Sequence, residues 1–191
     1  MKSLNQYIQE KLVINKDYRD NKIVVKSFEE LRKIIEDRYK KFGPGTKQNP
    51  IDFNDVDVSN IDSFYNKDDN EKGIFKSTDF KYIDISDWDV SNINNMNSMF
   101  FDCEKLESVG VISKWDVSNV TDMSFMFCDC YSFNQNISDW DVSNVTNMSH
   151  MFEYCNSFNQ DLSRWDVSSV TDKLGTFYRC GIKSEYKPKF K

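Results

Sequence analysis

The sequence predicts an α/β repeat protein, a solenoid in which each unit of about 25 residues supplies one short strand and one short helix. The first observation is a phrase, Trp-Asp-Val-Ser, that occurs four times, at intervals of 27, 25 and 25 residues. The second is that Met, Phe and Cys return at fixed distances behind each tryptophan. The third is a non-repeating segment before the phrases, which predicts an N-terminal helical cap. A single unit cannot bury its apolar face, so units in register predict a continuous stacked core.

The repeated positions are easiest to follow from the tryptophans: Trp88, Trp115, Trp140 and Trp165. Methionine stands eight residues later in three copies, phenylalanine twelve later and cysteine fifteen later in all four. The last two sets are Phe100, Phe127, Phe152, Phe177 and Cys103, Cys130, Cys155, Cys180. Register therefore predicts that like packs on like: tryptophan on tryptophan, phenylalanine on phenylalanine, and cysteine on cysteine.

The local spacing predicts the elements of each unit. Residues 145–155 carry apolar side chains at i, i+3, i+6, i+7 and i+10, which favours a short α-helix or 3₁₀ segment. Residues 133–140 show no helical stripe and are predicted to form the strand. One strand and one helix per unit of this length falls within the range of leucine-rich repeats.

The phrase W-D-V-S-N-V-T-x-M-x-x-M-F-x-x-C-x-x-F-N-Q, found at residues 140–160, resembles the tandem repeat of BspA-like leucine-rich-repeat proteins. The resemblance covers roughly residues 51–181. It implies a right-handed leucine-rich-repeat-like solenoid used for adhesion and protein–protein contact, as in bacterial surface proteins and lipoproteins. Similar repeats occur in proteins of gut bacteria and phages.

Three regions are predicted. Residues 1–47 form an N-terminal helical cap or docking segment, and both interpretations stay open. Residues 48–182 form the solenoid, with a weak unit near 51–64 and clear units from 81 onward. Residues 183–191 form a basic C-terminal tail.

The N-terminal region contains a strong helix signal. Ser27 and Glu30 form a capping box, an apolar stripe follows, and Gly43 before a proline ends the helix. A second, weaker helix is predicted at residues 3–12, with a short strand at 22–26 between them. Farther along, residues 65–80 contain an acidic insertion, read either as an exposed loop or as a contact loop.

Composition and motifs exclude several classes of function. A formal net charge of −6 argues against nucleic-acid binding, which needs a basic face. No stretch approaches the roughly 18 apolar residues of a membrane span. We expect a cytoplasmic protein because no signal peptide is seen, with the cell surface as the alternative if a leader is missing. The one histidine and the lack of a phosphate loop or zinc-protease motif predict that the protein is not an enzyme and uses no cofactor.

Two ladders of repeated side chains could carry chemistry. The cysteines could form a redox or metal ladder, but a small buried apolar side chain is the favoured interpretation, and no metal site is predicted. The aspartates after the tryptophans could bind calcium. The favoured interpretation is an Asx turn, in which each carboxylate accepts backbone N–H groups.

The candidate binding residues are those at which the copies disagree. The residue before each tryptophan alternates in charge, and three further variable side chains are aromatic or imidazole. These candidates are Asp87, Lys114, Asp139, Arg164, Phe125, Tyr131 and His150. The predicted function is a protein-binding scaffold with an unidentified protein partner and no assigned oligomeric state. The alternatives are a structural or assembly element that docks through its N-terminal helices and, more weakly, a glycan-binding module.

Overall fold

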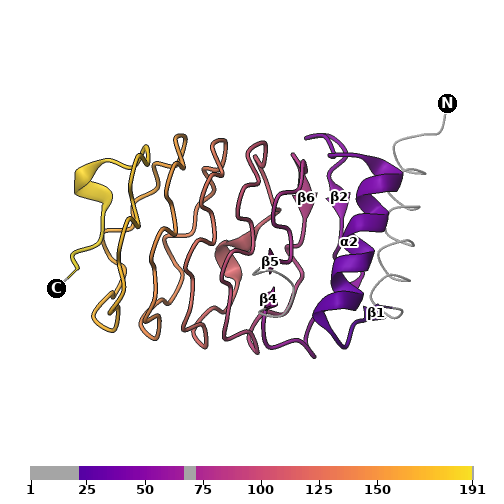
Figure 1. Ribbon diagram of the computed structural model, residues 1–191, viewed down its shortest axis with the longest axis horizontal. Helices are drawn as coiled ribbons and strands as arrows, with labels where there is room; N and C mark the ends of the chain where they lie inside the picture. Colours follow the sequence, from indigo (N-terminus) through magenta and orange to yellow (C-terminus); the bar gives the residue numbers. More distant parts are fainter. Residues whose placement is uncertain (1–21, 67–71, 191) are drawn as a thin grey trace, which may run out of the picture.

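The computed structural model describes residues 22–66 and 72–190 (Figure 1). The chain advances along the long axis of the molecule, from α2 (Phe28–Phe42) at one end to the C-terminal residues at the other. The helix predicted at residues 3–12 and the most acidic part of the insertion, residues 68–71, lie outside the described residues.

The helix α2 begins and ends where its sequence predicts. The Ser27 hydroxyl accepts a hydrogen bond from the Glu30 N–H at 3.2 Å, and the Glu30 carboxylate accepts one from the Lys26 N–H at 2.8 Å. At the other end, Gly43 takes φ 72° and donates its N–H to the Tyr39 carbonyl. Leu31 and Ile35 bury the apolar face of the helix.

In the part of the chain that the structure describes, the regular strands are all two residues long and occur in three pairs. Two pairs are parallel and one is antiparallel. The parallel pairs are β1 (Ile23–Val24) with β3 (Val56–Asp57) and β2 (Ile51–Asp52) with β6 (Ile83–Asp84), and the antiparallel pair is β4 (Tyr65–Asn66) with β5 (Lys72–Gly73). Two 3₁₀ turns complete the list: η1 (Ile112–Lys114) and η2 (Ser184–Tyr186).

The predicted leucine-rich-repeat-like solenoid of strand–helix units is therefore wrong. The one α-helix of the described chain, α2, precedes all four Trp-Asp-Val-Ser phrases, and the chain that carries these phrases is mostly irregular. Residues 133–140 form no strand, and residues 145–155 form no helix.

Two features of the backbone explain this irregularity. Asp and Asn side chains accept the N–H of the residue two positions later at many points, for example Asn147 from Ser149 at 3.0 Å. Such bonds compete with helix and strand hydrogen bonding. In addition, His150 and Tyr154 take positive φ values of 56° and 57°, which interrupts any right-handed helical run.

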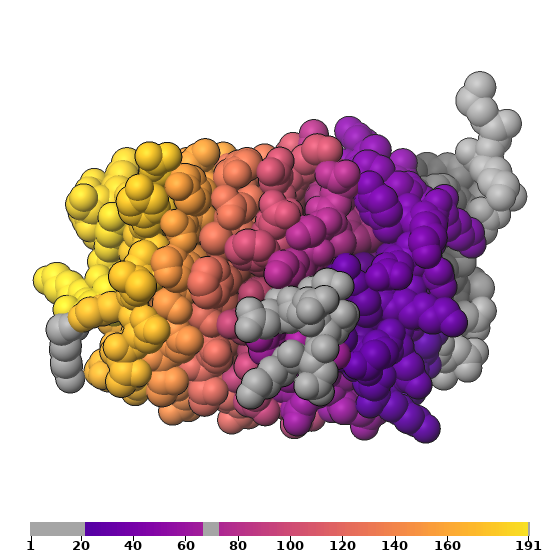
Figure 2. Space-filling model, in the orientation of Figure 1, coloured from indigo at the N-terminus to yellow at the C-terminus, as the bar shows by residue number. Residues whose placement is uncertain are grey.

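Although the backbone is irregular, corresponding segments of the chain lie side by side in the order of the sequence. We call residues 94–102, 121–129, 146–154 and 171–179 the four turn segments. Parallel bridges join them through Asn95, Asp122, Asn147 and Asp172. Alternate N–H groups of each segment donate to carbonyls of the next, as in Phe100 to Met126 at 2.9 Å. Figure 2 shows the result, because the colours succeed one another along the long axis without mixing.

The core lies inside this row and confirms that phenylalanine packs on phenylalanine and, at one junction, tryptophan on tryptophan. The rings of Phe100, Phe127, Phe152 and Phe177 stack in sequence, with centroids 5.4, 5.6 and 5.6 Å apart. Trp115 stacks on Trp140 at 6.3 Å. Six methionines are buried in the same core: Met96, Met99, Met123, Met126, Met148 and Met151.

Candidate functional site

Each turn segment contains two positions with left-handed backbone. Residues other than glycine pay about 1–2 kcal/mol for this conformation. The first position holds Ser98, Phe125, His150 and Gly175, with φ of 55°, 56°, 56° and 65°. The second holds Asp102, Asp129, Tyr154 and Arg179, with φ of 60°, 60°, 57° and 51°. The backbone is thus nearly constant while its side chains differ from segment to segment.

The side chains at and beside these positions form a strip that we call the turn surface: Phe101, Phe125, His150 and Tyr154. Phe125 stacks on His150 with ring centroids 4.7 Å apart, and Phe101 meets Phe125 edge to face at 6.1 Å. His150 Nδ1 contacts the Glu153 carboxylate. These four side chains are half-buried, so part of each is available to solvent.

The structure brings together two of the candidate binding residues, Phe125 and His150. Tyr131 is linked to the second left-handed position, because its hydroxyl donates to the Asp129 carboxylate at 3.2 Å. Partial burial and the nearby Asp129 charge raise the pKa of Tyr131. The three variable aromatic or imidazole residues are therefore all associated with the turn segments.

The residues before the tryptophans form no common site. Asp87, Lys114, Asp139 and Arg164 are all exposed. Arg164 lies 3.8 Å from Asp139, with 82% and 68% of the two side chains exposed, and such a pair contributes little stability. Among the described residues, this is the one ion pair that joins members of the alternating set.

The aspartates after the tryptophans form the Asx turns that the sequence predicts. Asp89, Asp116 and Asp141 each accept the N–H of a serine two residues later, at 3.1 Å in every case. The Ser118 hydroxyl and N–H lower the pKa of Asp116. Within residues 22–66 and 72–190, no group of three or more His, Cys, Asp or Glu side chains could hold a metal ion.

The cysteines form a buried ladder of free thiols. Cys103, Cys130 and Cys155 donate to carbonyls that lie about one repeat earlier in the chain. The acceptors are those of Phe75, Phe100 and Phe127, at 3.0, 2.9 and 2.8 Å. Burial raises the pKa of Cys103 to about 11 and raises the pKa values of the other two well above the ordinary range. A buried, protonated thiol is a poor nucleophile, which agrees with a packing role.

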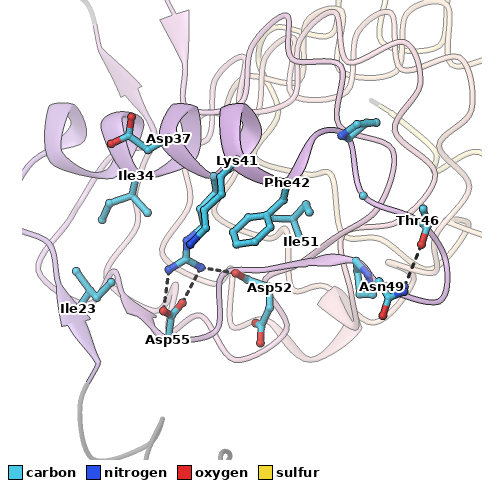
Figure 3. Close-up of a pocket in the computed structure, with 14 residues that line it drawn as sticks. Ile23, Ile34, Asp37, Lys41, Phe42, Thr46, Asn49, Ile51, Asp52 and Asp55 are labelled. Carbon is cyan, nitrogen blue, oxygen red and sulfur yellow. Dashed lines mark hydrogen bonds and ion pairs between the residues drawn. The ribbon is translucent and has the colours of Figure 1, made fainter.

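Sequence reasoning missed a cleft of about 770 Å³ between α2 and the chain around β2 (Figure 3). Ile34, Phe42 and Ile51 supply apolar wall. Arg38 crosses the cleft to bind both carboxylate oxygens of Asp55 at 2.7 Å.

Arg38 also donates to the Asp52 carbonyl, and burial together with the charges of Asp84 and Asp55 raises the pKa of the Asp52 carboxyl. The signal that could have revealed the cleft is Arg38 itself, a charged residue within the apolar stripe of the helix.

No described helix has the length and apolar character needed to cross a bilayer. No curated protein and no solved structure matches the chain. The resemblance to BspA-like repeats stays a prediction. One family model matches residues 69–187, well over half of the chain. The chain therefore belongs to the family described as Mycoplasma protein of unknown function, DUF285.

Proposed function

We propose that this protein binds another protein through the turn surface and performs no chemical step of its own. The observation that carries the proposal is the stacked pair Phe125 and His150, half-buried on a backbone that hydrogen bonds to both neighbouring turn segments. Rigid, partly exposed aromatic side chains are the residues that dominate protein–protein affinity.

The surroundings of the pair support an interface. Phe101 extends the aromatic strip on one side, while Glu153 and Asp129 supply polar groups around it. An apolar centre with a polar rim is the usual anatomy of a protein-binding patch. Because the positions have positive φ, glycine would be the least strained occupant, yet three of the four first positions carry a side chain.

The test replaces both Phe125 and His150 with serine, the residue that the first turn segment has at the corresponding position. Ser98 takes φ 55° in its turn segment, so Phe125→Ser and His150→Ser should preserve the backbone. Val111→Ser is the matched control, because Val111 is a 56% exposed apolar residue outside the turn segments. Immobilised chain and variants are compared for capture of the same partner from lysate of the source cells.

We expect Val111→Ser to bind like the unaltered chain and the double variant to bind at least about tenfold more weakly, since loss of an interface anchor costs about 2 kcal/mol or more. Equal binding by all three proteins would refute the turn surface as the binding site.

A second candidate function, docking through the N-terminal region, is favoured by the cleft beside α2. Phe42 is 56% exposed at its rim, and Ile23 and Val24 are 45% and 51% exposed nearby. In the same capture assay, Phe42→Ser tests this alternative. Loss of the partner with Phe42→Ser and its retention by the double variant would assign binding to the cleft instead.

A further inference from the structure

Two sets of backbone hydrogen bonds join consecutive turn segments. At the start of a segment, the N–H of Thr121, Thr146 or Thr171 donates back to the carbonyl of Asn94, Thr121 or Thr146. In the second set, four later residues of one segment donate their N–H groups, and the following segment accepts through its carbonyls. At the last junction the donors are Met148, His150, Phe152 and Tyr154, and the acceptors are Asp172, Leu174, Thr176 and Tyr178, at 2.7–2.9 Å. Corresponding bonds occur at the two earlier junctions. Because each segment of this second set donates to the one that follows it, the last segment has no following segment to accept its donors.

The unused donors lie on the last turn segment. The N–H groups of Gly175, Phe177 and Arg179 occupy the places of His150, Phe152 and Tyr154, and they meet no acceptor within the part of the chain that the structure describes. The C-terminal residues close the core instead, since the Phe190 ring lies 6.4 Å from that of Phe177. A row of unpaired backbone donors is a template for another chain.

Exposed apolar side chains flank these donors. Leu174 is 70% exposed and Tyr178 is 51% exposed. Ser124 and Ser149, which correspond to Leu174 in the two preceding segments, are buried and bind the side chains of their own Asx turns. The last segment therefore has a large apolar residue where the others use a small polar one.

The same end carries positive charge on a chain whose net charge is −6. Arg179, Lys183 and Lys187 lie over the rings of Tyr178, Tyr186 and Phe177 at 5.5, 5.1 and 5.6 Å. None of the ion pairs found among the described residues involves these three cations. Asp172 and Glu185 are the exposed acids nearby, so the local excess is positive.

We propose that this C-terminal edge, residues 172–179 with Lys183 and Lys187, binds an acidic peptide segment of another protein. Carbonyls of the segment accept the N–H groups of Gly175, Phe177 and Arg179. Its apolar side chains cover Leu174 and Tyr178, and its carboxylates pair with the cations. The inference goes beyond the proposed function, because it concerns the end of the row of turn segments and not their side.

A second copy of the chain does not fit this edge. Two such edges would oppose donor to donor and cation to cation. The opposite end of the row is closed by α2, whose Arg32 already donates to the carbonyls of Gly73 and Ile74 at 3.3 and 2.7 Å. Hydrogen-bond polarity and charge together select an acidic partner that presents free carbonyls.

The test uses two synthetic peptides and the ¹⁵N-labelled full chain. One peptide, TDMSDMFEY, follows residues 146–154 with Asn147 and His150 replaced by aspartate, and the other, TKMSKMFKY, has lysine in place of each acid. We expect the acidic peptide to shift and protect the amides of Gly175, Phe177 and Arg179, with an affinity that falls as salt rises.

Leu174→Ser and Tyr178→Glu should weaken binding of the acidic peptide about tenfold. These substitutions introduce the residues that the preceding turn segment has at the corresponding positions, Ser149 and Glu153. Val111→Ser should leave the binding unchanged. The proposal is overturned if neither peptide affects the three amides up to about 1 mM, or if both do so equally. It is also overturned if dilution alone shifts these amides, which would indicate self-association. Shifts confined to Phe125 and His150 would overturn the edge and leave the turn surface standing.

Discussion

At the scale of single residues, buried polar atoms show where the packing is complete and where it is not. The indole N–H groups of Trp140 and Trp165 donate to the carbonyls of Ile112 and Ile137 at 2.8 and 3.3 Å. The Trp115 indole N–H is buried without a partner. The interval from Trp88 to Trp115 is two residues longer than the later intervals, and the carbonyl that would correspond, that of Ile85, accepts no hydrogen bond from this indole.

This difference predicts unequal effects of the same substitution. Trp140→Phe removes a buried hydrogen bond to the Ile112 carbonyl, which keeps only the Trp115 backbone N–H, whereas Trp115→Phe removes a donor that is already unsatisfied. Both changes remove the same ring volume from a buried site. We expect Trp140→Phe to lower the free energy of unfolding by about 1–2 kcal/mol more than Trp115→Phe, as measured by urea denaturation. Equal losses would contradict the assigned hydrogen bond.

The buried thiols predict a loss of stability at high pH. The pKa of Cys103 is raised to about 11 in the folded protein, above the roughly 8.5 of an unfolded chain. Below pH 8.5 the thiol is neutral in both states, and its contribution to stability is complete. As pH rises from about 8.5 to 11, the unfolded state ionises first and the contribution is lost.

Between pH 8.5 and 10.5, the free energy of unfolding should therefore fall by about 2 kcal/mol less in Cys103→Ala than in the unaltered chain. The measurement is the unfolding free energy in urea at both pH values. Parallel losses in the two proteins would show that the Cys103 thiol does not titrate as its burial requires.

At the scale of elements, α2 is attached to the rest of the molecule by ionic contacts on one face. Arg38 binds Asp55 through both guanidinium nitrogens, and both side chains are 16% exposed. The guanidinium also lies 5.0 Å from the centre of the Phe53 ring. These contacts fix the helix over β2 and β3 and shape the cleft in Figure 3.

Removing one partner should be costly. Arg38→Ala leaves the largely buried Asp55 carboxylate without its cation, and we expect the free energy of unfolding to fall by about 2–3 kcal/mol. Lys33→Ala, on the exposed face of the same helix, is the control and should change it by less than about 0.5 kcal/mol. Thermal or urea unfolding of the two variants measures the difference. A loss for Arg38→Ala no larger than that of the control would mean that the ion pair does not anchor the helix.

At the scale of the whole molecule, the sequence predicted which residues stack but not what backbone they adopt. Regular spacing of Phe and Cys was enough to predict the stacked rings and the buried thiols. Helix α2 was predictable because capping and apolar spacing are local signals. The apolar spacing that suggested a short α-helix or 3₁₀ segment at 145–155 also fits a series of tight turns, which is the structure these residues adopt.

The rest of the site depends on information that residue types do not carry. Phe125 and Tyr154 have no preference for positive φ, so nothing in their identity revealed the left-handed positions. The cleft forms between α2 and residues 44–55, and its size depends on how these two parts pack. Of the candidate binding residues, Phe125 and His150 come together, whereas the alternating charges before the tryptophans form one exposed ion pair, Arg164 with Asp139, and no common site.

The central claim is that four N–H groups of each turn segment donate forward to the next segment, and that this forward set ends in open donors on the last segment. Residue-resolved amide hydrogen exchange on the full chain tests it most directly. We predict slow exchange for the donors that have partners, such as Phe100, Phe127 and Phe152, and fast exchange for Gly175 and Arg179. Fast exchange throughout the segments, or protection of Gly175 and Arg179 equal to that of Phe152 in the absence of any ligand, would contradict the account.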